Sequence, residues 1–174
     1  MQPTIKTEHL VLRPLVQSDA PRIQLLAGDW KIVEMTENIP HPYEDGMAEQ
    51  WIDTLHPAWE SRKSVTFGVC SVKQAELIGC CGLQISMPNK RASLGYWVGV
   101  DYWNKGFGTE AASAVVAFGF EELSLHRIQA QHLAKNPASG AVMRKIGMEH
   151  EATLVDYVMK SEQYENMELY AIFA

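Results

Sequence analysis

Apolar and polar residues alternate with two different periods in the first third of the chain, which predicts both strands and helices there. Residues 9–13 form a short apolar run typical of a strand, and residues 18–26 begin with a Ser-Asp pair that favours a helix start. Residues 29–45 contain Pro40 and Pro42, so we expect a loop with helical pieces there. Between residues 44 and 62, an amphipathic helix is indicated by the spacing of Met47, Trp51, Ile52, Leu55 and Trp59.

Strand-like runs dominate the rest of the chain, with two further helices between them. Strands are expected at residues 65–72, 77–83, 92–100, 127–133, 149–158 and 164–173, of which the first two form a hairpin. One helix runs from about Gly108 to Leu123 and carries a buried stripe: Ala112, Val115, Val116, Gly119, Phe120 and Leu123. A shorter helix begins at Asn136-Pro137 and ends before Gly147. Since no repeat or linker divides the chain, we predict one mixed α/β domain over residues 1–174.

Composition and charge narrow the classes of function. The chain has 174 residues, 47% hydrophobic and 21% charged, which is typical of one globular domain with its own core. A formal net charge of −6 argues against a nucleic-acid partner, because a binder of phosphate would present a basic face. The acidity suits a cationic partner, or it serves solubility alone.

The cysteines and histidines indicate neither a disulfide framework nor a metal site. Cys70, Cys80 and Cys81 form an odd set without a CxxC spacing and lie in apolar runs, so we expect small buried hydrophobes. The six histidines lack metal-ligand spacing, and no metal is predicted. No apolar signal region follows Met1 and no run of 18 apolar residues occurs, so we expect a cytoplasmic protein that does not enter a membrane.

A pair of glycines stands where a predicted strand leads into a helix. The segment is Lys105-Gly106-Phe107-Gly108-Thr109, and unpaired amides at a helix start together with Cβ-free glycines are suited to binding a pyrophosphate. A Walker A motif is absent. Gly106-x-Gly108-x-x-Ala111 matches the Rossmann pattern, but it lies far along the chain and no acid ends the next strand. The glycines could also serve only as a turn.

A second motif, Asn136-Pro137-Ala138-Ser139 followed by Lys145-Ile146-Gly147, places small polar side chains at another helix start. With the first motif, it resembles the GNAT acetyltransferases, and within them the branch of ribosomal-protein N-terminal acetyltransferases (RimJ/RimL-like). The resemblance also includes Gly95-Tyr96-Trp97-Val98, Tyr102-Trp103-Asn104, Leu10-x-Leu12-Arg13-Pro14 and Asn38-Ile39-Pro40-x-Pro42-Tyr43. It therefore covers nearly the whole chain.

The resemblance implies a GNAT fold, with one twisted mixed sheet of about seven strands and about four helices. The sheet would splay at its centre through a bulge near Val98–Val100, and the pantetheine arm of acetyl-CoA would enter the gap. Backbone groups of Trp97, Val98 and Val100 would bind the pantetheine and the acetyl carbonyl, and Asn136 would meet the pantetheine end. The pyrophosphate would be held by the amides of Lys105, Gly106, Phe107, Gly108 and Thr109.

The resemblance further implies direct attack of a primary amine on the thioester in a ternary complex. Ser139 is the candidate donor to the departing thiolate, although a serine there could also cap the helix. Many GNAT enzymes carry a tyrosine acid in this helix, but Met143 stands at that position. For the general base, Glu34 is our candidate ahead of Glu37 and Asp156, since Ser93 occupies a position where relatives often carry an acid.

The acceptor amine is expected to be a protein or peptide N-terminus. Acidic and aromatic residues between positions 29 and 43 would also suit a polyamine, an aminoglycoside or an amino acid. A non-catalytic acyl-CoA sensor is a further alternative. An exposed edge strand would be compatible with a homodimer, with burial or with simple solvation.

Overall fold

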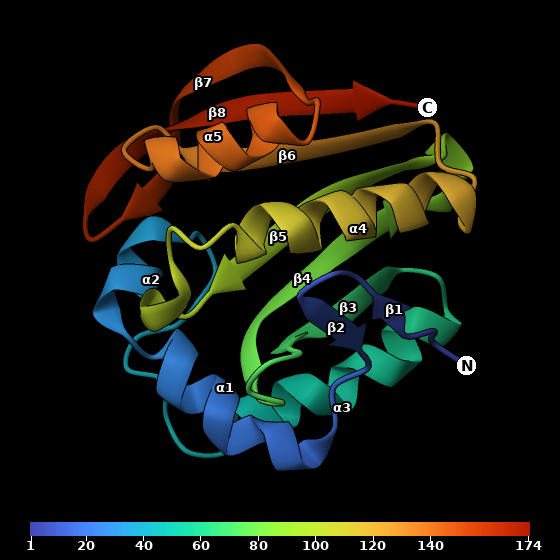
Figure 1. The fold of residues 1–174 in the computed structure, drawn as a ribbon. Coiled ribbons are helices and arrows are strands. Elements are labelled where there is room, and N and C mark those ends of the chain that lie inside the picture. The colour runs from blue at the N-terminus through green and yellow to red at the C-terminus, as the bar shows by residue number, and fades with distance from the viewer.

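An eight-stranded sheet is the central layer of the protein in the computed structural model, which describes residues 1–174 (Figure 1). The strand order is β1-β2-β3-β4-β5-β6-β8-β7, and every neighbouring pair is antiparallel except β5 and β6, which run parallel. The strands are β1 (Ile5–Lys6), β2 (Leu10–Arg13), β3 (Ser64–Ser71), β4 (Leu77–Ser86), β5 (Arg91–Val98), β6 (Arg127–Leu133), β7 (Glu149–Lys160) and β8 (Gln163–Phe173).

Five α-helices cover the sheet: α1 (Ala20–Ala27), α2 (Trp30–Met35), α3 (Met47–Glu60), α4 (Phe107–Glu121) and α5 (Pro137–Lys145). In Figure 1, α4 and α5 lie side by side in front of the sheet, each over a different part of it. The larger apolar cluster packs α4 against the sheet, and a smaller one packs α1 and α3 against β3 and β4. None of the helices combines the length and apolar composition needed to cross a bilayer.

Successive residues of β5 face opposite sides of the sheet, and this alternation positions the site. A Cβ on Gly108 of α4 would stand 3.6 Å from the Tyr96 ring and 3.9 Å from the Val98 side chain, so both residues face α4. Ser93, Gly95 and Trp97 therefore face the other side.

The sheet opens between β5 and β6. These strands pair only from Arg91–Leu94 to Arg127–Ala130, whereas β5 stays paired with β4 as far as Val98, and β6 stays paired with β8 as far as Leu133. Each strand follows its outer neighbour, so the two separate toward the ends where α4 and α5 begin (Figure 1). The splayed sheet is thus confirmed. The expected bulge near Val98–Val100 is wrong, because the β4–β5 register is unbroken and the separation starts after Leu94.

The structure contains one strand and one helix more than the sequence predicted. The additional strand, β1, has two residues, Ile5 and Lys6, which are too few to show a period. The additional helix, α2, has six residues and is a helical piece of the kind expected within residues 29–45, although its bounds were not predicted. The start of α2 could have been predicted from the sequence, because Asp29 is a favoured N-cap residue. Its carboxylate accepts a hydrogen bond from the Lys31 N–H.

Candidate active site at the gap between β5 and β6

The β5 side of the gap presents backbone groups that are not paired with β4. The Gly99 N–H donates to the Ile78 carbonyl at 2.8 Å, so the Val98 carbonyl in the same trans peptide points away from β4. The indole Nε1 of Trp103 donates to that carbonyl at 2.7 Å. By the alternation of antiparallel pairs, Tyr96 also turns its backbone groups toward the gap, whereas Trp97 turns them toward Cys80 of β4.

This alternation changes the predicted set of backbone contacts. Val98 lies at the gap as expected, and Val100 lies just beyond β5 in the 3-10 turn Val100–Tyr102. The backbone groups of Trp97 face β4, which differs from the expectation. Tyr96 takes that place on the gap edge, and the strand period could have identified it.

Helix α4 starts at the gap with free amides. Gly106 is its N-cap residue with φ +83°, and a Cβ there would meet nothing within 4 Å. The Glu110 N–H donates to the Gly106 carbonyl, which leaves the N–H groups of Phe107, Gly108 and Thr109 without a protein acceptor. The predicted glycine segment therefore forms an open, positively polarised helix start.

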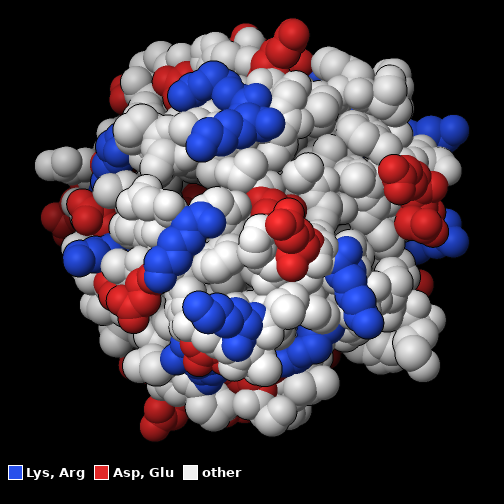
Figure 2. Space-filling model, in the orientation of Figure 1, with Lys and Arg blue, Asp and Glu red and all other residues white.

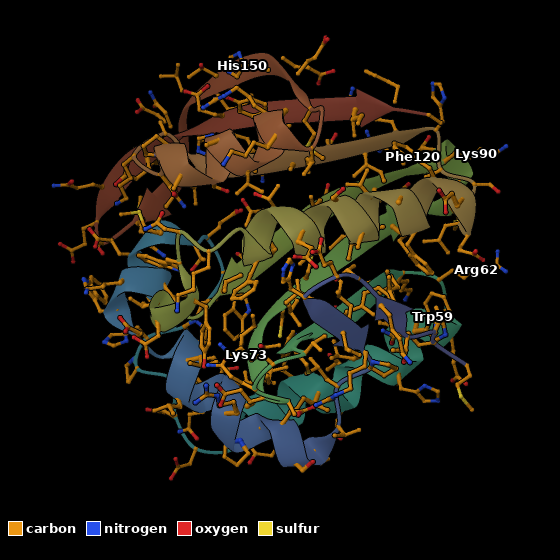
Figure 3. The ribbon with its side chains drawn as sticks, viewed as in Figure 1. Trp59, Arg62, Lys73, Lys90, Phe120 and His150 are labelled. Carbon is orange, nitrogen blue, oxygen red and sulfur yellow. The ribbon has the colours of Figure 1, made fainter.

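Two surface hollows flank this helix start. One, of about 560 Å³, is lined by residues that include Gly106, Thr109, Ser113 and Lys145. The other, of about 360 Å³, is lined by residues that include Lys73 and Lys105. Figure 2 shows basic side chains spread over this face with acidic atoms between them, and Figure 3 labels Lys73 on the same face. The Lys105 Nζ lies 5.6 Å from the centre of the Tyr102 ring.

Helix α5 starts on the other side of the gap and is capped by Asn136. Its Oδ1 accepts from the Ser139 N–H at 3.3 Å, and its Nδ2 donates to the Met35 carbonyl of α2 at 3.2 Å. Both ends of the Asn136 amide are therefore used within the protein. Because Asn136 supplies the cap, the Ser139 hydroxyl is not needed for that purpose.

The Ser139 hydroxyl instead contacts Tyr96 across the gap. The Ser139 Oγ lies 2.8 Å from the Tyr96 hydroxyl, which also lies 3.3 Å from the Ser139 carbonyl oxygen. Burial raises the pKa of Tyr96 to about 12, although the Ser139 hydrogen bond acts in the opposite direction. The phenol is thus protonated at neutral pH. Sequence reasoning did not assign Tyr96 a role, because the contact joins residues 43 positions apart.

On the opposite face, the end of α2 reaches the gap. The Gln131 Nε2, one residue beyond the last β5–β6 pair, lies 3.5 Å from the Glu37 Oε2. The Lys160 ammonium donates to the Thr36 carbonyl. Burial lowers the pKa of Lys160, as does Lys135, while Glu37 and Glu34 oppose the shift. Of the predicted acids, Glu37 is therefore the one that contacts a strand bordering the gap.

The remaining predicted acids lie elsewhere. The charge of Glu34 acts on Lys160 and opposes the lowering of its pKa. Asp156 lies at the irregular part of the edge strand β7, where its N–H donates to the Asn166 Oδ1 at 2.9 Å. Ser93 pairs with Gln129 inside the parallel ladder, just before the strands separate.

The cysteines take no part in the site. Cys70, Cys80 and Cys81 are free and buried, as predicted. Burial raises the pKa of each thiol, which disfavours a nucleophilic thiolate.

Comparison with known proteins supplies the family. The acetyltransferase (GNAT) domain matches residues 9–149. The chain belongs to the GNAT acetyltransferase family. It is therefore an N-acetyltransferase, as the motifs predicted. Among its relatives, the uncharacterised N-acetyltransferase p20 of Bacillus licheniformis is 32% identical over 158 residues, covering 88% of this chain and 86% of that protein.

Ribosomal-protein acetyltransferases are also among the relatives of this GNAT protein. The [ribosomal protein uS5]-alanine N-acetyltransferase of Escherichia coli is 24% identical over 174 residues, covering 97% of this chain and 89% of that protein. The structure of RimL, a ribosomal L7/L12 α-N-protein acetyltransferase in complex with coenzyme A, has a TM-score of 0.91 at 17% identity, covering 98% of each chain. Spermidine N-acetyltransferase from Vibrio cholerae, with CoA and spermine, has a TM-score of 0.82 at 21% identity, covering 96% of each chain. Both structures share the fold.

Proposed function

We propose that this protein transfers the acetyl group of acetyl-CoA to the α-amine of a protein or peptide N-terminus, by direct attack in a ternary complex. The observation that carries the proposal is the gap after Leu94 and Ala130, with free helix amides and a serine hydroxyl on one face and a carboxylate on the other. Donor and acceptor would meet through this gap.

The donor side fits acetyl-CoA. The free N–H groups of Phe107, Gly108 and Thr109 would bind its pyrophosphate, and Gly106 leaves the approach open. Lys105 would supply a countercharge. The backbone of Tyr96 and Val98 would bind the pantetheine arm as an added strand would. The Ser139 hydroxyl would donate to the sulfur as the thiolate leaves.

The charges on the acceptor side favour a single ammonium group over a polyamine. The charges of Glu37 and Glu34 act on the Lys160 ammonium and oppose the lowering of its pKa, and Glu165 forms an ion pair with Lys135 at 2.6 Å. A substrate with several positive charges would need acids without such partners, whereas a peptide N-terminus carries one charge on its amine.

We propose Glu37, in place of Glu34, as the general base. It would remove a proton from an α-ammonium group, whose usual pKa is about 8. The contact with Gln131 would hold its carboxylate beside the gap. Holding the amine and the thioester together can supply about 7–11 kcal/mol of the lowering of the barrier, in addition to the contribution of the base.

The first experiment measures acetyl-CoA consumption and free-thiol release with N-terminal peptides, spermidine, aminoglycosides and amino acids as acceptors. We expect turnover on peptides, a kcat lower by roughly 100-fold in Ser139→Ala, and an unchanged acetyl-CoA affinity by calorimetry. Ser18→Ala, at an exposed serine far from α5 in the sequence, is the matched control. CoA binding without turnover on any amine would instead indicate a sensor, and turnover on spermidine alone would overturn the peptide assignment.

A second pair of variants tests the base. Glu37→Gln should lower kcat/KM by roughly 100-fold at pH 7, with less effect at high pH, where the amine is already deprotonated. Glu34→Gln should remain within about twofold. The reverse order of effects would return the role to Glu34.

A further inference from the structure

We propose that Tyr96 is a positioning residue for Ser139: its phenol donates a hydrogen bond to the Ser139 Oγ and thereby directs the Ser139 hydrogen toward the leaving sulfur. The inference rests on the proposed function. It concerns a side chain on β5, outside the two motifs that predicted the site.

The hydroxyl hydrogens of Tyr96 and Ser139 can be arranged in two ways. Only one of them leaves the Ser139 hydrogen free to reach the sulfur. Serine and tyrosine each carry one hydroxyl hydrogen. If Ser139 donates to Tyr96, the Ser139 hydrogen is consumed, and the phenol donates to the Ser139 carbonyl at 3.3 Å. If Tyr96 donates to the Ser139 Oγ at 2.8 Å, the Ser139 hydrogen is free. The 3.3 Å separation is long for a bond from a hydroxyl to an oxygen, whereas 2.8 Å is the usual distance, which favours the second arrangement.

The surroundings of Tyr96 hold the phenol in place. Its ring lies beside Gly108 in the first turn of α4, and its hydroxyl lies on the first turn of α5. Tyr96 therefore bridges the helix starts on both sides of the gap. Because burial keeps the pKa of Tyr96 near 12, the donor hydrogen is present across the working pH range.

The role differs from that of a tyrosine acid within α5. Met143, at that helix position, is buried at 1% exposure and has no donor hydrogen. During transfer the amine nitrogen bonds to the acetyl carbon, the C–S bond breaks, and the sulfur takes the electron pair. The base passes the ammonium proton to solvent before the attack and then accepts the second proton from the nitrogen, and the thiolate takes a proton from solvent after release. Ser139 stabilises the sulfur anion between these steps, and Tyr96 remains protonated throughout.

Kinetics on the full-length protein test this arrangement through a double-mutant cycle. Tyr96→Phe should lower kcat by roughly 10-fold without changing acetyl-CoA affinity. The double variant Tyr96→Phe/Ser139→Ala should match Ser139→Ala alone, because Tyr96 acts only through Ser139. Effects that multiply would overturn the proposal, since Tyr96 would then act on its own.

A spectroscopic readout tests the contact without turnover. In protein labelled at the tyrosine ζ-carbon, six signals are expected, and the one missing in Tyr96→Phe is assigned to Tyr96. Its chemical shift should move in Ser139→Ala and stay in place in Ser18→Ala, while the other signals report an intact fold. An unmoved Tyr96 signal would overturn the hydrogen bond.

The two proposals fail in distinguishable ways. Absence of turnover by the wild-type protein on every amine overturns the proposed function and this inference with it. Wild-type turnover together with an unaffected Tyr96→Phe variant overturns only the role of Tyr96.

Discussion

At the level of single residues, the first turn of α5 is held from both strands that border the gap. Tyr96 of β5 contacts Ser139, and His132 of β6 packs against the next residue, Gly140. The His132 ring is buried, its Nδ1 lies 2.8 Å from the Leu133 carbonyl, and it stacks on Tyr170. The position of the Ser139 hydroxyl therefore depends on two aromatic side chains from different strands.

Gly140→Ala should disturb this turn. The new Cβ would stand 2.6 Å from the His132 Nε2, and stacking on Tyr170 limits how far that ring can yield. We expect a loss of about 1–3 kcal/mol of unfolding free energy, measured by urea denaturation, together with a lower kcat. The control is Gly95→Ala, whose Cβ would meet nothing within 4 Å. Equal stabilities of the two variants would contradict the packing argument.

Asp19 links stability to pH near the start of α1. Burial opposes its ionisation, yet hydrogen bonds from Arg13 and the Val16 N–H outweigh that effect and lower its pKa. Because the folded-state pKa lies below the unfolded value of about 3.9, this stabilisation is full above that pH and disappears as pH falls through the folded-state pKa.

Asp19→Asn should therefore lose about 2 kcal/mol at pH 7, and the difference from the wild type should shrink in acid. Denaturation at a series of pH values measures it, with the exposed Asp101→Asn as control. A difference that stays constant with pH would show that the carboxylate charge is not responsible.

At the level of elements, the two helices that border the gap have different N-terminal caps. Helix α5 uses the Asn136 side chain, whereas α4 uses the left-handed conformation of Gly106 and leaves its first amides open. A side-chain cap on α4 would occupy the amides that we assign to the pyrophosphate.

The variants Gly106→Ala and Gly106→Asn distinguish two roles of Gly106: adopting a left-handed backbone conformation, and leaving room for CoA to reach the helix start. Alanine at φ +83° should cost about 1 kcal/mol of stability, whereas asparagine tolerates this conformation and should cost less. Both should weaken CoA binding in calorimetry, because each adds a Cβ on the open side of the loop. Wild-type CoA affinity in either variant would remove Gly106 from the proposed site.

At the level of the whole molecule, residues distant in sequence meet at the end of α2, on the side where we propose that the acceptor binds. The end of α2 receives hydrogen bonds from three parts of the C-terminal half: Lys160 at the β7–β8 tip, Asn136 before α5, and Gln131 on β6. Both halves of the chain thus shape the proposed acceptor side, while the proposed donor side is built mainly around α4 and α5.

Lys160→Met should loosen this closure. The expected result is a several-fold higher KM for the acceptor and an unchanged affinity for acetyl-CoA, because the Thr36 contact lies on the acceptor face. Steady-state kinetics and calorimetry measure the two effects, and the exposed Lys31→Met on α2 is the control. A change confined to acetyl-CoA affinity would contradict the assignment of the two faces.

The sequence by itself determined what depends on neighbouring residues. Hydrophobic periods located the longer strands and helices, and helix-start signals located the segments around Gly106 and Asn136, because side-chain spacing and helix capping both depend on residues close together in the chain. Burial of the three cysteines followed from their apolar runs. Short β1 and α2 lacked enough residues to establish a period.

Only the tertiary structure decided which groups meet at the gap. The separation of β5 from β6 depends on each strand keeping its other partner, so no local pattern could show that it begins after Leu94. The same separation brings Tyr96 to Ser139, and the register of the β4–β5 pair turns the Trp97 backbone toward β4. Long-range packing likewise distinguishes Glu37 from Glu34, since the contact with Gln131 spans 94 positions of the chain.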